Sequence, residues 1–160
     1  MLPDNLINKI RENFLSKNYK KVIIDCELLI KDYPDHAILY NFAGVSCQAI
    51  RNFSKSINFL KKAIEIEPNN ISYMNNLANS YASIRNYKNA EKTYNKAISI
   101  NKNNKIILTN LANFKRRNLH NESAIELYKK LINIEDNDPS VNNNLAECYQ
   151  EIGNFSESNK

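Results

Sequence analysis

The pattern of apolar and polar residues between Ile71 and Asn104 predicts two short amphipathic helices. In the first half, apolar or small residues follow a helical spacing of three to four: Tyr73, Met74, Leu77, Ala78 and Tyr81. In the second half the apolar face consists of Ala90, Tyr94, Ala97 and Ile98, and charged residues are left for water. Helices of about 13 residues, each roughly 20 Å long, cannot bury such stripes alone. We therefore expect helix pairs that stack on one another.

The same pattern returns along the chain with a constant period of about 34 residues, a length typical of a repeat array. Leu77-Ala78 returns one period later as Leu111-Ala112 and two periods later as Leu145-Ala146. We predict a single domain over residues 1–160, with a degenerate first repeat at 4–36, complete repeats at 37–70, 71–104 and 105–138, and a partial terminal repeat at 139–160.

These residues resemble the tetratricopeptide repeat, whose order is a large residue, Leu, Gly or Ala, Tyr, then Ala, an aromatic residue and Ala. The match is carried by the residues Met74, Leu77, Ala78, Tyr81, Ala90, Tyr94 and Ala97. Three repeats share the register, and the resemblance covers nearly the whole chain. It implies an all-α fold, a right-handed α-solenoid of antiparallel helix pairs with about four and a half repeats.

Both ends depart from the pattern. The first helix of the first repeat, with Leu6, Ile10 and Phe14, fits only when it is slipped by about one residue. The last segment supplies a first helix that we expect to end near Gly153, after which Phe155 and Ser158 match the opening of a second helix. Within the complete repeats, turns are expected near Arg51-Asn52, Arg85-Asn86 and Leu119-His120.

An array that stops after one helix leaves an apolar face uncovered, which natural arrays avoid with a polar cap. Two interpretations follow: the chain is a fragment of a longer protein, or a partner covers this end. A further possibility is self-association through the uncapped end near Gly153.

Charge and composition exclude several classes of function. The formal net charge of +5 comes from basic residues spread over different repeats, so we expect no nucleic-acid binding. The early Asp4 interrupts any signal-peptide-like run, and the most apolar stretch, from Val22 to Ile30, is too short to span a bilayer. We expect no membrane insertion and a cytoplasmic location.

Candidate chemistry is sparse. His36 and His120 lie in separate turns without a nucleophile placed beside them by a motif, and Cys26, Cys47 and Cys148 fall on apolar stripes without metal-ligand spacing. The acidic residues at helix ends and loops are expected to be solvated: Glu65, Glu67, Glu135, Asp136 and Asp138. We predict no catalytic residues, no metal site, no cofactor and no enzymatic activity from these residues alone.

The resemblance also implies a binding surface, because in this family the first helix of each repeat lines the concave side. The candidate residues for a peptide-binding groove are Asn41, Asn75, Asn76, Asn79, Asn110, Asn113, Arg116, Asn143 and Asn144. A side-chain amide offers two donor hydrogens and one acceptor oxygen, so a ladder of amides can pair with the backbone of an extended peptide. The alternative is that asparagine is simply common in this chain and covers a solvated surface.

The arrangement is similar to the asparagine-lined superhelix of the O-linked N-acetylglucosamine transferase family, where the ladder holds polypeptide. Phe42 interrupts it in one repeat and Glu147 replaces an asparagine in another. Arg116 and Arg117 would add a preference for acidic segments. The carboxylate clamp of chaperone-tail-binding members is excluded, because its cationic places fall on uncharged residues: Asn75, Ser72 or Ser140, and Asn76 or Asn144.

Two functions remain open. The chain is a binding module that takes a peptide or partner protein in an amide-rich groove. Alternatively, it is the N-terminal, substrate-recruiting arm of a larger bacterial glycosyltransferase or sulfotransferase, whose catalytic domain lies outside these residues. The sequence beyond Lys160 would distinguish the two.

Overall fold

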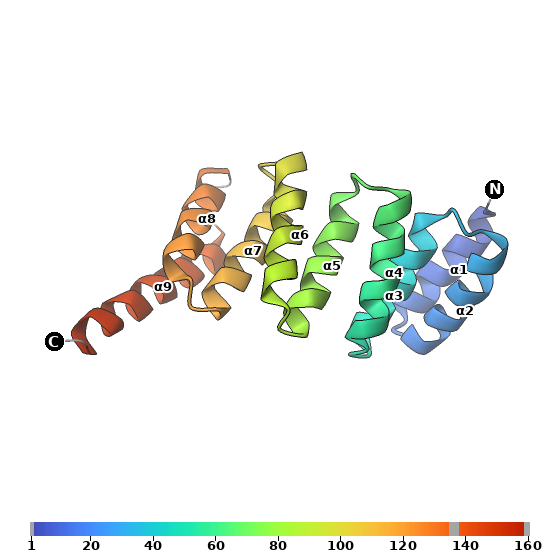
Figure 1. Cartoon of the computed structure of the whole chain (residues 1–160), viewed down its shortest axis with the longest axis horizontal. Helices are drawn as coiled ribbons and strands as arrows, with labels where there is room; N and C mark the ends of the chain where they lie inside the picture. The colour runs from blue at the N-terminus through green and yellow to red at the C-terminus, as the bar shows by residue number, and fades with distance from the viewer. Residues whose placement is uncertain (1, 135–137, 159–160) are drawn as a thin grey trace. The chain divides into compact units, whose positions relative to one another are not determined.

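The computed structural model describes residues 2–134 and 138–158, with side chains as far as Gly153, and these residues form helices and short turns. Glu135 and Asp136, expected to be solvated, lie outside the described residues. The helices, in chain order, are α1 (Asp4–Leu15), α2 (Tyr19–Asp32), α3 (Ala37–Ala49), α4 (Phe53–Ile66), α5 (Ile71–Ser83), α6 (Tyr87–Ile100), α7 (Lys105–Arg117), α8 (Asn121–Ile134) and α9 (Pro139–Ser158) (Figure 1). The described part of the chain contains no strand, so the prediction of an all-α fold is confirmed.

The chain divides into two compact units, residues 1–97 and residues 98–160. In the first unit, α3 packs against both α2 and α4, and α4 packs against α5. In the second unit, α8 packs against both α7 and α9. The first helix of one repeat also contacts the first helix of the next repeat. These contacts join α1 to α3, α3 to α5, and α7 to α9. Each unit therefore consists of stacked antiparallel helix pairs.

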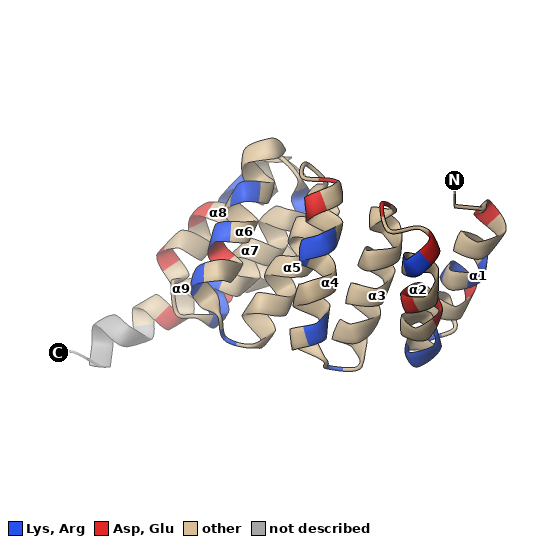
Figure 2. Ribbon diagram, turned by 45° about the vertical axis from the view of Figure 1, so that its right-hand side comes forward, with Lys and Arg blue, Asp and Glu red and all other residues tan. Residues whose placement is uncertain are grey.

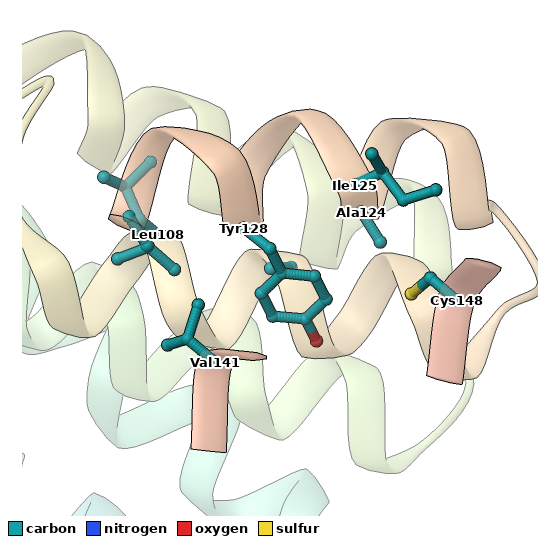
Figure 3. Close-up of a cluster of buried hydrophobic side chains, with 8 residues drawn as sticks. Leu108, Ala124, Ile125, Tyr128, Val141 and Cys148 are labelled. Carbon is teal, nitrogen blue, oxygen red and sulfur yellow. The ribbon is translucent and has the colours of Figure 1, made fainter. Parts of the chain in front are cut away.

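The predicted stripes form the core of each unit. In the first unit, Leu39, Ala43, Leu60, Met74 and Ala78 are almost completely buried. In the second unit, Tyr128 lies among Leu108, Ala124, Val141 and Cys148 (Figure 3). Burial of these apolar side chains supplies most of the stabilisation that the short helices lack in isolation.

Gly44 shows how closely the two helices of a repeat approach. A Cβ atom added at Gly44 would lie 2.7 Å from Cγ of Leu60 and 2.9 Å from one of its methyl carbons. Leu60 is itself completely buried. Packing against Leu60 therefore requires a small residue at Gly44.

The turn inside each repeat has one recurring geometry. Lys17, Arg51, Arg85 and Leu119, each one repeat period after the last, have positive φ angles of 59°, 62°, 59° and 61°. The next residue donates its backbone N–H to the carbonyl five residues earlier, as in Asn52 to Cys47 at 2.8 Å and Asn86 to Tyr81 at 2.9 Å. This hydrogen bond closes a Schellman motif. The three turns predicted from the sequence are confirmed.

The first repeat keeps the common register more closely than its sequence suggests. Its turn residue, Lys17, lies one full period before Arg51, and α1 ends at Leu15, one full period before Ala49. Ile10 is buried at the repeat position that Gly44 occupies in the next repeat. The predicted slip is therefore wrong, and α1 differs only in beginning at Asp4, one residue later than α3 begins in its repeat.

The prediction that the first helix of the terminal repeat ends near Gly153 is wrong. Helix α9 runs without a turn from Pro139 to Ser158, so Phe155 and Ser158 belong to it. Gly153 stands one period after Leu119 but does not adopt positive φ. In repeats such as α3–α4 and α7–α8, a second helix packs back against the first and stabilises the turn. No such helix covers α9 within the described residues, and Ala146 is exposed where Gly44, Ala78 and Ala112 are buried.

Across the described residues, each helix is either too short or too polar to cross a lipid bilayer.

Candidate peptide-binding surface

The predicted groove residues all lie on first helices, but the structure gives them different surroundings. In the first unit, Asn41 lies on α3, and Asn75, Asn76 and Asn79 lie on α5. In the second unit, Asn110, Asn113 and Arg116 lie on α7, and Asn143 and Asn144 lie on α9. Most are partly buried, whereas Asn143 is exposed. Asn75 is only 9% exposed, so its side chain is not presented to a ligand.

An amide–amide hydrogen bond joins neighbouring first helices in the first unit. Nδ2 of Asn76 donates to Oδ1 of Asn41 at 2.9 Å. The two side chains are partly buried, so each sits at the surface with its orientation fixed by the other. This bond uses one of the two amide hydrogens of Asn76 and leaves each amide capacity for a further partner.

A buried polar network supports this part of the surface. Nε2 of Gln48 donates to the carbonyl oxygen of Asn76 and to Oγ of Ser80, both at 2.6 Å. Ser80 is also 2.8 Å from Ser56 of α4, oxygen to oxygen. The network holds α3, α4 and α5 together and fixes the backbone that carries Asn76.

A related amide bridge occurs in the second unit, with its acceptor at a different repeat position from Asn41. Nδ2 of Asn144 donates to Oδ1 of Asn113 at 3.3 Å. Asn144 lies at the repeat position of Asn76, two periods later in the chain. In both units, an asparagine at this position therefore bridges to an asparagine of the preceding first helix.

Two of the predicted asparagines accept hydrogen bonds from tyrosines of their own repeats. The hydroxyl of Tyr128 donates to Oδ1 of Asn113 at 2.7 Å, and the hydroxyl of Tyr94 donates to Oδ1 of Asn79. Both tyrosines are almost fully buried, so each amide satisfies a hydroxyl that would otherwise be costly to bury. Sequence reasoning missed this role. Its signal is an asparagine followed by a tyrosine at one fixed spacing, the same in two successive repeats.

The cation predicted beside the ladder is already neutralised. Nη1 of Arg116 forms an ion pair with Glu147 of α9, the residue that replaces an asparagine in the ladder. Arg117, the other candidate, is exposed. The Arg116–Glu147 pair weakens the expected preference for acidic segments.

Burial of Tyr128 nearby raises the pKa of its phenol above the ordinary value, because desolvation outweighs the opposing effect of Arg116.

His36 and the cysteines are held in the packed part of the structure, whereas His120 is exposed. Nε2 of His36 accepts a hydrogen bond from the backbone N–H of Leu2 at 3.2 Å, and its ring packs edge-on against Tyr33. Burial raises the pKa of the Cys26 thiol to about 12 and that of Cys47 to about 11. Such thiols stay protonated and unreactive near neutral pH. Among the described residues no group of three or more His, Cys, Asp or Glu side chains is placed to hold a metal ion.

Comparison with known proteins agrees with this geometry. The family described as the tetratricopeptide repeat matches residues 37–70 and 71–104, the two repeats with the boundaries predicted above. No curated protein has a significant sequence match to the chain.

Several solved structures share the fold. Two crystal structures of MamA superpose with TM-scores of 0.80 and 0.82 at 18% and 17% identity. These matches cover 89% and 96% of this chain, and 83% and 84% of theirs. The first tetratricopeptide-repeat domain of Spaghetti (RPAP3), bound to the HSP90 peptide SRMEEVD, has a TM-score of 0.68 at 19% identity over 73% of this chain and 93% of its own.

Tetratricopeptide repeats are generally non-catalytic interaction modules, and the fold of this chain is consistent with protein–protein interaction. Two of its repeats match the family, the turn geometry extends the same period through the neighbouring helix pairs, and one solved tetratricopeptide-repeat domain superposes on 73% of the chain. Residues 37–104 therefore carry two tetratricopeptide repeats, and the chain has the fold of a tetratricopeptide-repeat array.

Proposed function

We propose that this chain binds an extended segment of a partner protein along the amide-bearing surfaces of its first helices. The observation that carries the proposal is the recurring amide bridge. Asn76 and Asn144, at one repeat position, each donate to an asparagine on the preceding first helix. The two acceptors, Asn41 and Asn113, lie at different repeat positions, so what recurs is the donor position and its link to the preceding first helix.

The bridges suit recognition of a peptide backbone. Each fixes the rotamer of two amides, so less side-chain entropy is lost when a ligand arrives. Oδ1 of Asn113 already accepts from Asn144 and Tyr128, but the bridged amides keep unused N–H donors, and Asn41, Asn76 and Asn144 also keep acceptor capacity, for the alternating N–H and C=O groups of an extended chain. Such a surface selects for an accessible, unfolded segment and makes few demands on its side chains.

The charges argue against a ligand anchored by its C-terminal carboxylate. The residues at the places of a carboxylate clamp, Asn75, Asn76 and Asn144 among them, carry no positive charge, and Arg116 is paired with Glu147. Without charge-assisted hydrogen bonds, a terminal carboxylate gains little here. We therefore expect an internal segment of the partner as ligand.

The test compares two triple variants of the full chain. The first, Asn76→Ala with Asn110→Ala and Asn144→Ala, removes amides from the first helices. The matched control, Asn58→Ala with Asn95→Ala and Asn133→Ala, removes three exposed amides from second helices. Each protein captures partners from a lysate, bound proteins are identified by mass spectrometry, and the affinities of synthetic peptides from the captured proteins are measured.

The first-helix variant should lose the captured proteins and bind their peptides at least about tenfold more weakly, a loss equal to about 1.4 kcal/mol. The control should bind like wild type. Circular dichroism should show equal helicity in all three, because exposed or partly exposed positions contribute little to stability. Equal capture by all three proteins would contradict the proposal.

A further inference from the structure

Helix α2 carries two large apolar residues on its solvent-facing side. Ile24 is 57% exposed and Leu28 is 56% exposed, whereas Val22 and Cys26 on the opposite face are completely buried. The equivalent positions in the other second helices are polar or charged: Asn58 and Lys62 in α4, Lys92 and Lys96 in α6, and Glu126 and Lys130 in α8. The repeat fold therefore does not require apolar residues here, and the first repeat alone has them.

Two shallow hollows flank Leu28. One, of about 490 Å³, is lined by Ile24, Leu28, Ile30 and Phe59 together with the charged Glu27 and Lys31. The second, of about 160 Å³, is lined by Leu6, Ile10, Leu28 and Leu29 together with Lys9 and Asp25. Leu28 thus lies between two depressions whose lining is mainly apolar. A ridge flanked by two grooves can pack against another helix, whose own side-chain ridges fill the grooves.

Charged residues continue the line of Ile24 and Leu28 at both ends. Lys20, Ile24, Leu28 and Asp32 follow one another at intervals of four residues, and all four are exposed. Residues at this spacing form the ridge that packs in the commonest class of helix–helix contact. The order along the ridge is cation, apolar, apolar, anion. Figure 2 shows basic and acidic residues together on α2.

This order is complementary to itself when reversed. In an antiparallel pair of α2 helices, Ile24 of one copy meets Leu28 of the other, and Lys20 meets Asp32 twice, once at each end. A cation in the first turn and an anion in the last turn are both unfavourable for an isolated helix, because they oppose its dipole. In the antiparallel pair each charge instead lies near the oppositely charged end of the partner helix.

We propose that the ridge Lys20–Ile24–Leu28–Asp32 is a self-association surface, through which two copies of this chain pair about a two-fold axis with their α2 helices antiparallel. An interface with two-fold symmetry requires a surface that complements itself. The contact is small, so the dimer is transient. It leaves the amide-bearing first helices α3 and α5 uncovered.

Sedimentation velocity of the full chain over roughly 10 to 500 µM tests the proposal, a range suited to a small interface. Wild type should shift from monomer towards dimer as its concentration rises. The double variant Ile24→Asn with Leu28→Lys, which introduces the residues that α4 carries at these positions, should weaken dimerisation at least about tenfold. The matched control Asn58→Ala with Lys62→Ala in α4 should dimerise like wild type.

Charge reversal tests the antiparallel arrangement itself. Lys20→Asp alone, or Asp32→Lys alone, places like charges opposite each other at both ends and should weaken the dimer by roughly threefold to tenfold. The double variant Lys20→Asp with Asp32→Lys should restore it. Both substitutions favour the helix dipole, so weakening cannot be attributed to a less stable α2.

Three results would overturn the proposal. Wild type could remain a monomer throughout the range, or the Ile24/Leu28 variant could dimerise as well as wild type. The double charge reversal could also fail to restore the dimer. Wild type could also remain a monomer but capture another protein that the Ile24/Leu28 variant fails to capture. That result would assign the ridge to a different partner and would likewise reject pairing between copies.

Discussion

At the scale of single residues, the asparagines on the first helices have two roles. Asn79 and Asn113 accept hydrogen bonds from buried tyrosine hydroxyls. Asn76 and Asn144 donate to an asparagine of the preceding first helix, and Asn113 also accepts the bond from Asn144. The sequence placed all four on first helices. It could not separate the roles, because the partner of an amide depends on side-chain orientation and not on the spacing of apolar residues.

The hydrogen bond between Asn113 and Tyr128 gives a prediction at this scale. Asn113→Ala should lower the free energy of unfolding by about 1–3 kcal/mol, because it leaves a buried hydroxyl without an acceptor. Tyr128→Phe should cost only about 0.5–1.5 kcal/mol, since the partly exposed amide that remains can bind water. The double variant should lose less than the sum of the two. Urea unfolding of the four proteins measures the coupling, and losses that add within about 0.3 kcal/mol would contradict it.

At the scale of helices and turns, the sequence predicted what depends on local pattern and missed what depends on packing. The turns at Arg51, Arg85 and Leu119 follow from the period and are present. The turn expected at Gly153 is absent, although glycine adopts positive φ more readily than the Lys, Arg and Leu residues at the other turns. A second helix that packs back stabilises those turns. Gly153 lacks that support in the described structure, so its intrinsic preference does not decide its conformation.

The two glycines give opposite predictions for the same substitution. Gly44→Ala should lower stability by about 1–3 kcal/mol, because the new methyl group overlaps the buried Leu60. Gly153→Ala should raise the stability of α9 by about 0.5–1 kcal/mol, since nothing lies within 4 Å of the added Cβ and alanine favours helix. Thermal unfolding measures the first, and amide hydrogen exchange in α9 measures the second. A loss of protection after Gly153→Ala would show a turn at this residue.

At the scale of the whole molecule, charge is dispersed and not concentrated. The net charge is +5, but the basic residues are spread over several helices, and some helices, such as α2 in Figure 2, carry both signs. Lys55 is paired with Glu27 at 2.7 Å, Lys62 with Glu65 at 2.5 Å, and Arg116 with Glu147. Pairing of this kind removes the local positive potential that a polyanion requires.

The dispersed charge predicts weak and non-specific contact with nucleic acid. Binding to a short fluorescent DNA duplex, or to its single strand, should be detectable by anisotropy only at low salt and should vanish at physiological ionic strength. Few phosphates would be neutralised, so little counterion release would drive association. Binding that persists at physiological salt would reveal a basic surface that the ion pairs do not neutralise.

The turn that closes each helix pair also bears on how such a chain grows in evolution. Each turn is completed by its own backbone hydrogen bond, from Asn18 to Asn13 in the first repeat and from His120 to Lys115 in the fourth, and no other repeat contributes to that bond. A duplicated coding sequence one period long therefore encodes a helix pair together with the complete turn that joins its two helices. Gene duplication can lengthen the protein one repeat at a time, and later mutation is left to alter what the copied helices present to other molecules.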